Sequence, residues 1–102
     1  MIIYNTTFSV PRKLQNEFLS FIRNEYIPLS IKSNIMTEPR LTRIFGKDED
    51  SELSYALEFK TSSIDTLEKW NEMEGRKLYS LILNKFKQNI LGFATLMQLI
   101  DP

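Results

Sequence analysis

The sequence contains no cysteine and no histidine. Without cysteine there can be no disulfide, zinc–thiolate site, iron–sulfur cluster or thiolate nucleophile. Without histidine the chain lacks the side chain that most often serves as a general base, a metal ligand or a haem ligand. We therefore expect neither a metal site nor a cofactor.

Glycine is scarce, and neither sign of charge is in excess. The three glycines stand at positions 46, 75 and 92, too far apart to form a phosphate-binding loop. Thirteen basic and thirteen acidic side chains give a net charge of zero, so charge gives no reason to expect a nucleic acid or an acidic membrane as partner. The acidic run at 48–50 lacks the spacing and central glycine of a calcium loop and predicts a solvated connection.

Long apolar runs are also missing. None approaches the roughly 18 residues that a membrane span needs, and the N-terminus lacks the basic region of an export signal. We therefore expect a cytoplasmic protein with no membrane partner. With 102 residues, 42% of them apolar, residues 1–102 have the size of a single domain with one core.

The first part of the chain predicts a strand followed by a helix. Residues 2–10 alternate between two faces with β-branched and aromatic side chains, which is typical of a strand. Pro11 suits the first turn of a helix. Pro28 should end or kink this helix near residues 26–27, and Asn34 should close a further short turn in the left-handed conformation. The apolar stripe of the helix consists of Leu14, Phe18, Phe21 and Ile22.

The middle of the chain predicts a hairpin, and the last part a second helix and a final strand. Strands at 41–45 and 53–59 are joined by a short polar connection, as in antiparallel hairpins. Residues 62–65 fit a capping-box start to the second helix. Gly75 costs about 1 kcal/mol in a continuous helix, so we expect a break or kink there. Residues 91–100, rich in apolar side chains, predict the last strand.

The element order strand, helix, strand, strand, helix, strand predicts an α+β domain with the ferredoxin-like βαββαβ arrangement. Two helices would then cover one face of a four-stranded antiparallel sheet and leave the other face open.

The last predicted strand is apolar on both sides, with Phe93 and Met97 facing one way and Leu96 and Ile100 the other. Such a strand requires cover on both faces. A homodimer that packs sheet against sheet, as in dimeric α/β barrels, is the simplest solution. Alternatively, the chain termini or the bent helices flank this strand.

Five short motifs occur in order, one in each predicted strand and one at the end of the first predicted helix. They are Tyr4-Asn5-Thr6-Thr7, Glu25-Tyr26-Ile27-Pro28, Arg40-Leu41-Thr42-Arg43, Tyr55-Ala56-Leu57-Glu58-Phe59 and Phe93-Ala94-Thr95-Leu96. Over nearly the whole chain the sequence resembles the small bacterial proteins grouped as domain of unknown function 4286. The resemblance implies a ferredoxin-like fold in the dimeric α/β-barrel style and no established activity, substrate or cofactor.

Two polar residues in predicted strands are candidates for ligand binding. Asn5 lies on the more polar side of the first strand, together with Thr7, although asparagine is uncommon in strands. It could face a cavity, or it could form hydrogen bonds across a dimer interface or to a bulge. Arg43 could meet a ligand carboxylate, or it could pair with a neighbouring acid such as Glu58.

Three aromatic residues could also line a pocket. Tyr26 can donate or accept a hydrogen bond, but an ordinary phenol pKa near 10 makes it a poor base. Tyr55 and Trp70 are amphipathic side chains that fit either a pocket wall or the core. The candidate ligand-binding set is therefore Asn5, Tyr26, Arg43 and Tyr55, with no catalytic residue assigned.

Three functions are compatible with these observations. The first is a non-catalytic homodimeric module that binds a small molecule or another protein. The second is a cofactor-free oxygenase or isomerase that acts on a small, largely apolar substrate in a dry cavity. The third is an effector-sensing domain, which is less well supported because such domains accompany a DNA-binding partner that this chain has no room to include.

Overall fold

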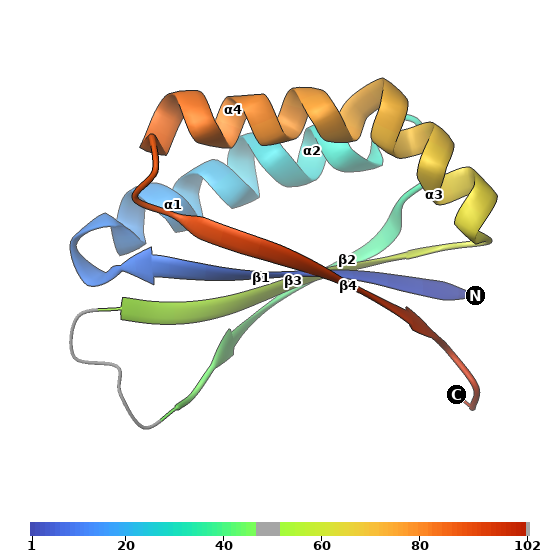
Figure 1. Ribbon diagram of the computed structural model, residues 1–102, viewed down its shortest axis with the longest axis horizontal. Helices are drawn as coiled ribbons and strands as arrows, with labels where there is room; N and C mark the ends of the chain where they lie inside the picture. Colours follow the sequence, from blue (N-terminus) through green and yellow to red (C-terminus); the bar gives the residue numbers. More distant parts are fainter. Residues whose placement is uncertain (47–51, 102) are drawn as a thin grey trace.

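The computed structural model describes residues 1–46 and 52–101. Its centre is a four-stranded sheet with the spatial order β2-β3-β1-β4, in which every neighbouring pair is antiparallel. The strands are β1 (Ile2–Pro11), β2 (Thr37–Ile44), β3 (Glu52–Thr61) and β4 (Leu91–Gln98). The helices lie together on one face of this sheet (Figure 1). The predicted ferredoxin-like arrangement is confirmed.

The helical segments form two runs, one in each crossover connection. The first run consists of η1 (Arg12–Leu14), α1 (Gln15–Phe21), η2 (Ile22–Tyr26) and α2 (Ile27–Ile31). The second consists of α3 (Ile64–Trp70), η3 (Asn71–Gly75) and α4 (Arg76–Phe86). Each run thus contains one π-helical segment, η2 or η3.

The first run passes through Pro28 without ending. Proline lacks an N–H, and its ring clashes with the preceding turn of a regular α-helix. The π turn just before it relieves this conflict, because the N–H of Ile27 bonds to the carbonyl of Ile22, five residues earlier. The helix continues to Ile31, and Asn34 then adopts the expected left-handed conformation with φ 64°.

The second run begins at a capping box. The Thr66 N–H donates to Ser63 Oγ at 3.2 Å, and the Ser63 N–H donates to Thr66 Oγ1 at 3.1 Å. The expected kink at Gly75 is a π turn, in which the Arg76 N–H bonds to the carbonyl of Asn71. α3 and α4 run in different directions on either side of it (Figure 1).

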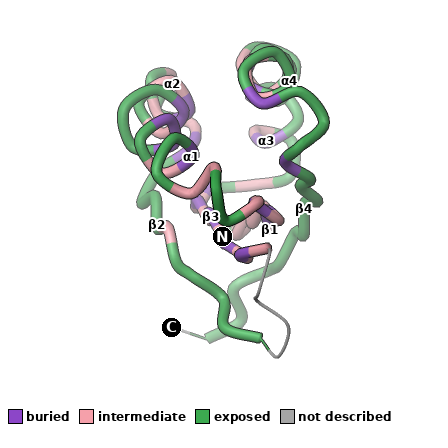
Figure 2. Tube along the Cα trace, turned by 90° about the vertical axis from the view of Figure 1, so that its left-hand side faces the viewer, coloured by how far each residue is buried: buried purple, intermediate pink, exposed green. Residues whose placement is uncertain are grey.

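The two central strands, β1 and β3, separate the core from the open face of the sheet. Phe8 lies opposite Tyr55 and Val10 opposite Leu53, and all four are buried beneath the helices. The alternate residues point to the other side, where no helix of the described chain covers the sheet (Figure 2). We call this side the open face.

The two edge strands of the sheet, β2 and β4, differ in their regularity and in where they begin and end relative to the sequence prediction. β2 starts at Thr37, earlier than expected, because a bulge with Glu38 at φ 50° accommodates Pro39. β4 ends at Gln98, earlier than expected, and contains no charge, proline or bulge. Every residue of β4 is exposed, and nearly all of β2 is as well (Figure 2).

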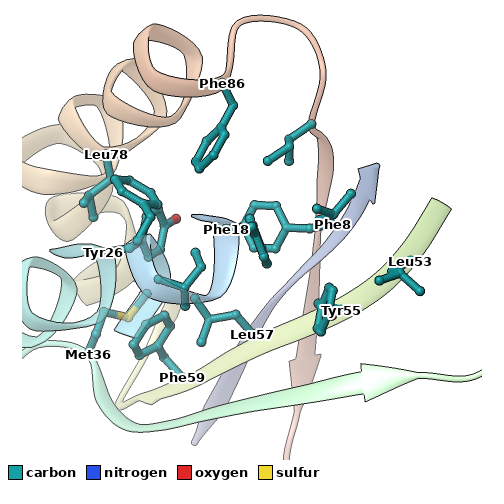
Figure 3. Close-up of a cluster of buried hydrophobic side chains, with 14 of the residues drawn as sticks. Phe8, Phe18, Tyr26, Met36, Leu53, Tyr55, Leu57, Phe59, Leu78 and Phe86 are labelled. Atoms are coloured by element: carbon teal, nitrogen blue, oxygen red, sulfur yellow. The ribbon is translucent and has the colours of Figure 1, made fainter. Parts of the chain in front are cut away.

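The core lies between the two helical runs and the sheet (Figure 3). Phe18 packs against Phe8 with ring centroids 5.2 Å apart, and Phe86 of α4 packs against Phe21 at 5.6 Å. These edge-on aromatic contacts join α1, α4 and β1. The acidic run expected to form the hairpin connection lies outside the described residues.

Candidate functional site

A cavity of about 860 Å³ lies between the second helical run and the strands β1 and β4. Its volume is in the range of small-molecule sites. The lining comes from β1 (Tyr4, Thr6, Phe8), η2 (Tyr26), the second run (Trp70, Asn71, Gly75, Arg76, Tyr79, Ser80, Ile82, Leu83) and the segment through β4 (Gln88, Ile90, Leu91, Gly92, Phe93, Ala94).

The strand side of the cavity is formed by small residues of β4 beside larger residues of β1. Gly92 lies opposite Phe8, and Ala94 lies opposite Thr6. A Cβ atom at Gly92 would lie 3.2 Å from the Phe8 ring. Gly92 therefore leaves room for the Phe8 ring, and Ala94 adds only a methyl group to the strand side of the cavity.

The helix side of the cavity is one face of α4. Arg76, Tyr79, Ser80 and Leu83 follow the three- and four-residue spacing of a single helical face, and all four line the cavity. Core residues of the same helix, such as Leu78, lie on another face. One face of α4 thus packs into the core, and another lines the cavity.

Tyr26 lies deep in the structure, where Phe8 and Phe21 contact its ring edge-on. Burial, with nearby Tyr4 as a smaller contribution, raises the pKa of the Tyr26 hydroxyl well above its ordinary value of about 10. No group in the described chain forms a hydrogen bond with this hydroxyl. Tyr26 is therefore a neutral phenol that lines the cavity and is free to donate a hydrogen bond.

Trp70 forms the wall between the cavity and the core. Its indole Nε1–H donates to the carbonyl oxygen of Ser30 at 2.9 Å, which satisfies an acceptor in the last turn of α2. Its ring lies 5.9 Å from that of Tyr4. The tryptophan therefore holds the two helical runs together while one side of it meets the cavity.

The charge of the cavity lining is carried by one residue. Among the lining residues, all of them in the described chain, Arg76 is the single formally charged side chain, and none is acidic. No cluster of three or more aspartate, glutamate, histidine or cysteine residues suited to a metal ion occurs within residues 1–46 and 52–101. Over the same residues, no helix has the length and hydropathy needed to cross a bilayer.

The structure does not bring the four sequence candidates together. Tyr26 lines the cavity. Asn5 lies on the open face, where its Nδ2 donates to Thr7 Oγ1 at 3.1 Å. Tyr55 is buried in the core, and its hydroxyl accepts a hydrogen bond from Gln15 Nε2 at 2.8 Å.

Arg43 is exposed on β2, with its guanidinium carbon 5.0 Å from the centre of the Phe45 ring. The suggested pairing with Glu58 is wrong. Glu58 lies directly opposite Arg40, which forms an ion pair with it at 2.6 Å. Arg43 lies opposite Tyr55, on the other side of the strand.

Sequence reasoning missed most of the cavity residues. The sequence predicts a solvated position for Arg76 and no ligand-binding role for Arg76 or Tyr79, because the strongest periodic signal in this helix comes from its core stripe. A second, weaker signal was present in the sequence: Arg76, Tyr79, Ser80 and Leu83 also share a helical face. Only the packing of that face above Gly92 and Ala94 makes it a cavity wall.

The sequence of residues 1–100 matches the family model described as a domain of unknown function (DUF4286). The chain belongs to this family. The resemblance in the five motifs is therefore confirmed across the whole domain. No curated protein sequence matches the chain.

Solved structures share the fold at low sequence identity. A protein of the ethyl tert-butyl ether (EthD) family from Bacillus halodurans has a TM-score of 0.73 at 16% identity, covering 98% of this chain and 100% of that one. A candidate antibiotic biosynthesis monooxygenase from Deinococcus radiodurans has a TM-score of 0.69 at 8% identity, covering 100% and 95%. A dimeric ferredoxin-like protein from an uncultured marine organism has a TM-score of 0.67 at 10% identity, covering 100% and 97%. At these identities the likeness establishes the fold alone.

Proposed function

We propose that this DUF4286 protein is a homodimeric binding module that holds a small, largely apolar molecule in the cavity between α4 and the strands β1 and β4. The observation that carries the proposal is the cavity itself, with apolar and aromatic walls and a few separate hydrogen-bonding groups. Tyr26 and Thr6 supply such groups from two different elements. They suit the orientation of a ligand within a mostly apolar site.

The dimer in this proposal forms through the open face. Phe93 and Met97 lie on that face opposite Thr7 and Ile3, and they are 64% and 40% exposed. Exposed apolar side chains gathered on one face are typical of an interaction surface. A second copy of the chain can cover this face symmetrically, and a structural neighbour with the same fold is described as dimeric.

A native mass spectrum of the freshly purified protein tests assembly and ligand together. We expect a dimer that carries additional, dissociable mass. Binding of the neutral fluorophore N-phenyl-1-naphthylamine provides a second test that does not depend on a retained ligand. A protein that binds neither a co-purified molecule nor this probe is not a module for apolar ligands.

A bulky side chain in the cavity should weaken binding. Ser80→Trp places a large ring on the cavity face of α4, and we expect it to weaken probe binding about tenfold or more. Asn84→Trp, on the same helix but outside the lining, is the matched control and should bind as the wild type does. Equal effects of both substitutions would place the bound probe elsewhere.

A cofactor-free oxygenase is the second candidate. One observation favours it: fold neighbours are described as monooxygenases. The mass of the ligand recovered after aerobic incubation separates the candidates. A binding module returns the ligand unchanged, whereas an oxygenase returns it with added oxygen.

A further inference from the structure

We infer that the ligand of this cavity is an aromatic monocarboxylate whose acid group is held by Arg76. The inference rests on the proposed binding function and adds the chemical class of the ligand. It is carried by the position of one unpaired cation in an otherwise uncharged, aromatic lining.

Arg76 lacks a partner within the part of the chain that the structure describes. Its side chain forms no ion pair, hydrogen bond or cation–π contact there, although Glu72 lies one helical turn before it. The ion pairs formed by the described residues, Arg40–Glu58 and Glu38–Lys60, lie on β2 and β3 instead. The guanidinium of Arg76 is thus available to a ligand.

The local electrostatics favour an anion over a cation or a neutral ligand. The lining contains one positive side chain and no carboxylate, so a bound molecule with one negative charge neutralises the site. A guanidinium can bind both oxygens of a carboxylate with parallel hydrogen bonds. Arg76 is exposed at the edge of the cavity, so a carboxylate can reach its guanidinium while the apolar part of the ligand contacts the lining.

The shape and chemistry of the remaining lining indicate an aromatic body. Aromatic side chains pack favourably edge-on or offset against aromatic ligands. The aromatic lining residues on the helix-covered side of the sheet are Tyr4, Phe8, Tyr26, Trp70 and Tyr79. A cavity of about 860 Å³ accommodates one or two fused rings together with the acid group.

Competition against N-phenyl-1-naphthylamine tests the inference with two ligands of the same shape. 2-Naphthoate carries the negative charge, and 2-naphthamide replaces it with a neutral amide. On the wild-type protein we expect 2-naphthoate to displace the probe at a concentration about tenfold below that of 2-naphthamide. Arg76→Gln should abolish this preference, and Arg76→Lys should retain part of it.

Lys77→Gln is the matched control, because Lys77 is the exposed neighbour of Arg76 on the same helix and lies outside the lining. It removes the same charge and should keep the wild-type preference. Equal competition by both ligands on the wild type, or an unchanged preference in Arg76→Gln, would overturn the carboxylate assignment. Failure of the probe itself to bind would overturn the proposed function, so the two failures are distinguishable.

Discussion

At the scale of single residues, the clearest consequence of the fold concerns Tyr26. Its ring is enclosed by Phe8 and Phe21, and burial keeps the hydroxyl neutral beyond the range of an ordinary phenol. A neutral phenol can donate a hydrogen bond into the cavity over the whole physiological pH range. The same burial makes the stability of the protein depend on pH under alkaline conditions.

Tyr26 should make the free energy of unfolding fall as pH rises above about 10. The folded state retains the phenol proton because the pKa is raised, whereas the unfolded chain releases it at the ordinary value. The contribution is fully present below about pH 10 and is lost as pH rises toward the folded pKa, at up to about 1.4 kcal/mol per pH unit. Urea titrations between pH 8 and 11 measure this slope.

Tyr26→Phe should show a shallower slope than the wild type, because the titrating proton is gone. Tyr4, the neighbouring titratable group, remains in both proteins. Tyr79→Phe, which removes the hydroxyl of a tyrosine that is 68% exposed, is the matched control. Identical slopes in wild type and Tyr26→Phe would contradict the raised pKa.

At the scale of elements, each helical run contains a π turn next to a residue that a regular α-helix tolerates poorly. In the first run, η2 precedes Pro28; in the second, η3 ends at Gly75. A Cβ atom on Gly75 would lie 2.9 Å from Cζ3 of Trp70 and would also overlap the side chain of Asn71. Glycine is therefore required here for close approach, since its φ of −58° is an ordinary helical value.

Gly75→Ala should destabilise the protein by about 1–3 kcal/mol, because the new methyl group displaces the buried Trp70 ring. The intrinsic helix preference of alanine, about 1 kcal/mol over glycine, acts in the opposite direction. Chemical denaturation provides the measurement. Gly46→Ala is the control, because its Cβ meets nothing within 4 Å. A Gly75→Ala protein more stable than the wild type would show that Trp70 moves at little cost.

At the scale of the whole molecule, the sheet is covered on one face and open on the other. The open face carries ion pairs near β2 and exposed apolar side chains along β4. β4 is also an edge strand without the bulge or proline that limits pairing at β2. The exposed apolar side chains Phe93 and Met97 lie on the open face, where we propose that the second copy packs.

Met97→Glu should convert the dimer to a monomer. Met97 lies on the open face, outside the cavity lining, and a carboxylate buried there would lack a partner. We expect dimerisation to weaken about a hundredfold or more, measured by sedimentation equilibrium. Met73→Glu, on η3 and 52% exposed, makes the same change away from the sheet and should leave the dimer intact. A wild-type protein that sediments as a monomer at every concentration would contradict the proposed interface.

Much of the fold could be predicted because local patterns in this chain agree with the final packing. The alternation of β1, the Ser63 capping box and the left-handed Asn34 are each decided within a few residues. The π turns were less predictable. Pro28 and Gly75 indicated where the helices would change direction. A π turn and a break in the helix both accommodate such residues, so the sequence does not distinguish between them.

The sequence by itself determined the element order and the open sheet face, because these follow from hydrophobic periodicity and from the number of helices. Only the tertiary structure decided the cavity. Tyr26, Arg76 and Ala94 come from three distant parts of the chain, and no periodic pattern links them. Their proximity results from how closely α4 can approach β4, a distance that side-chain volumes on both elements set together.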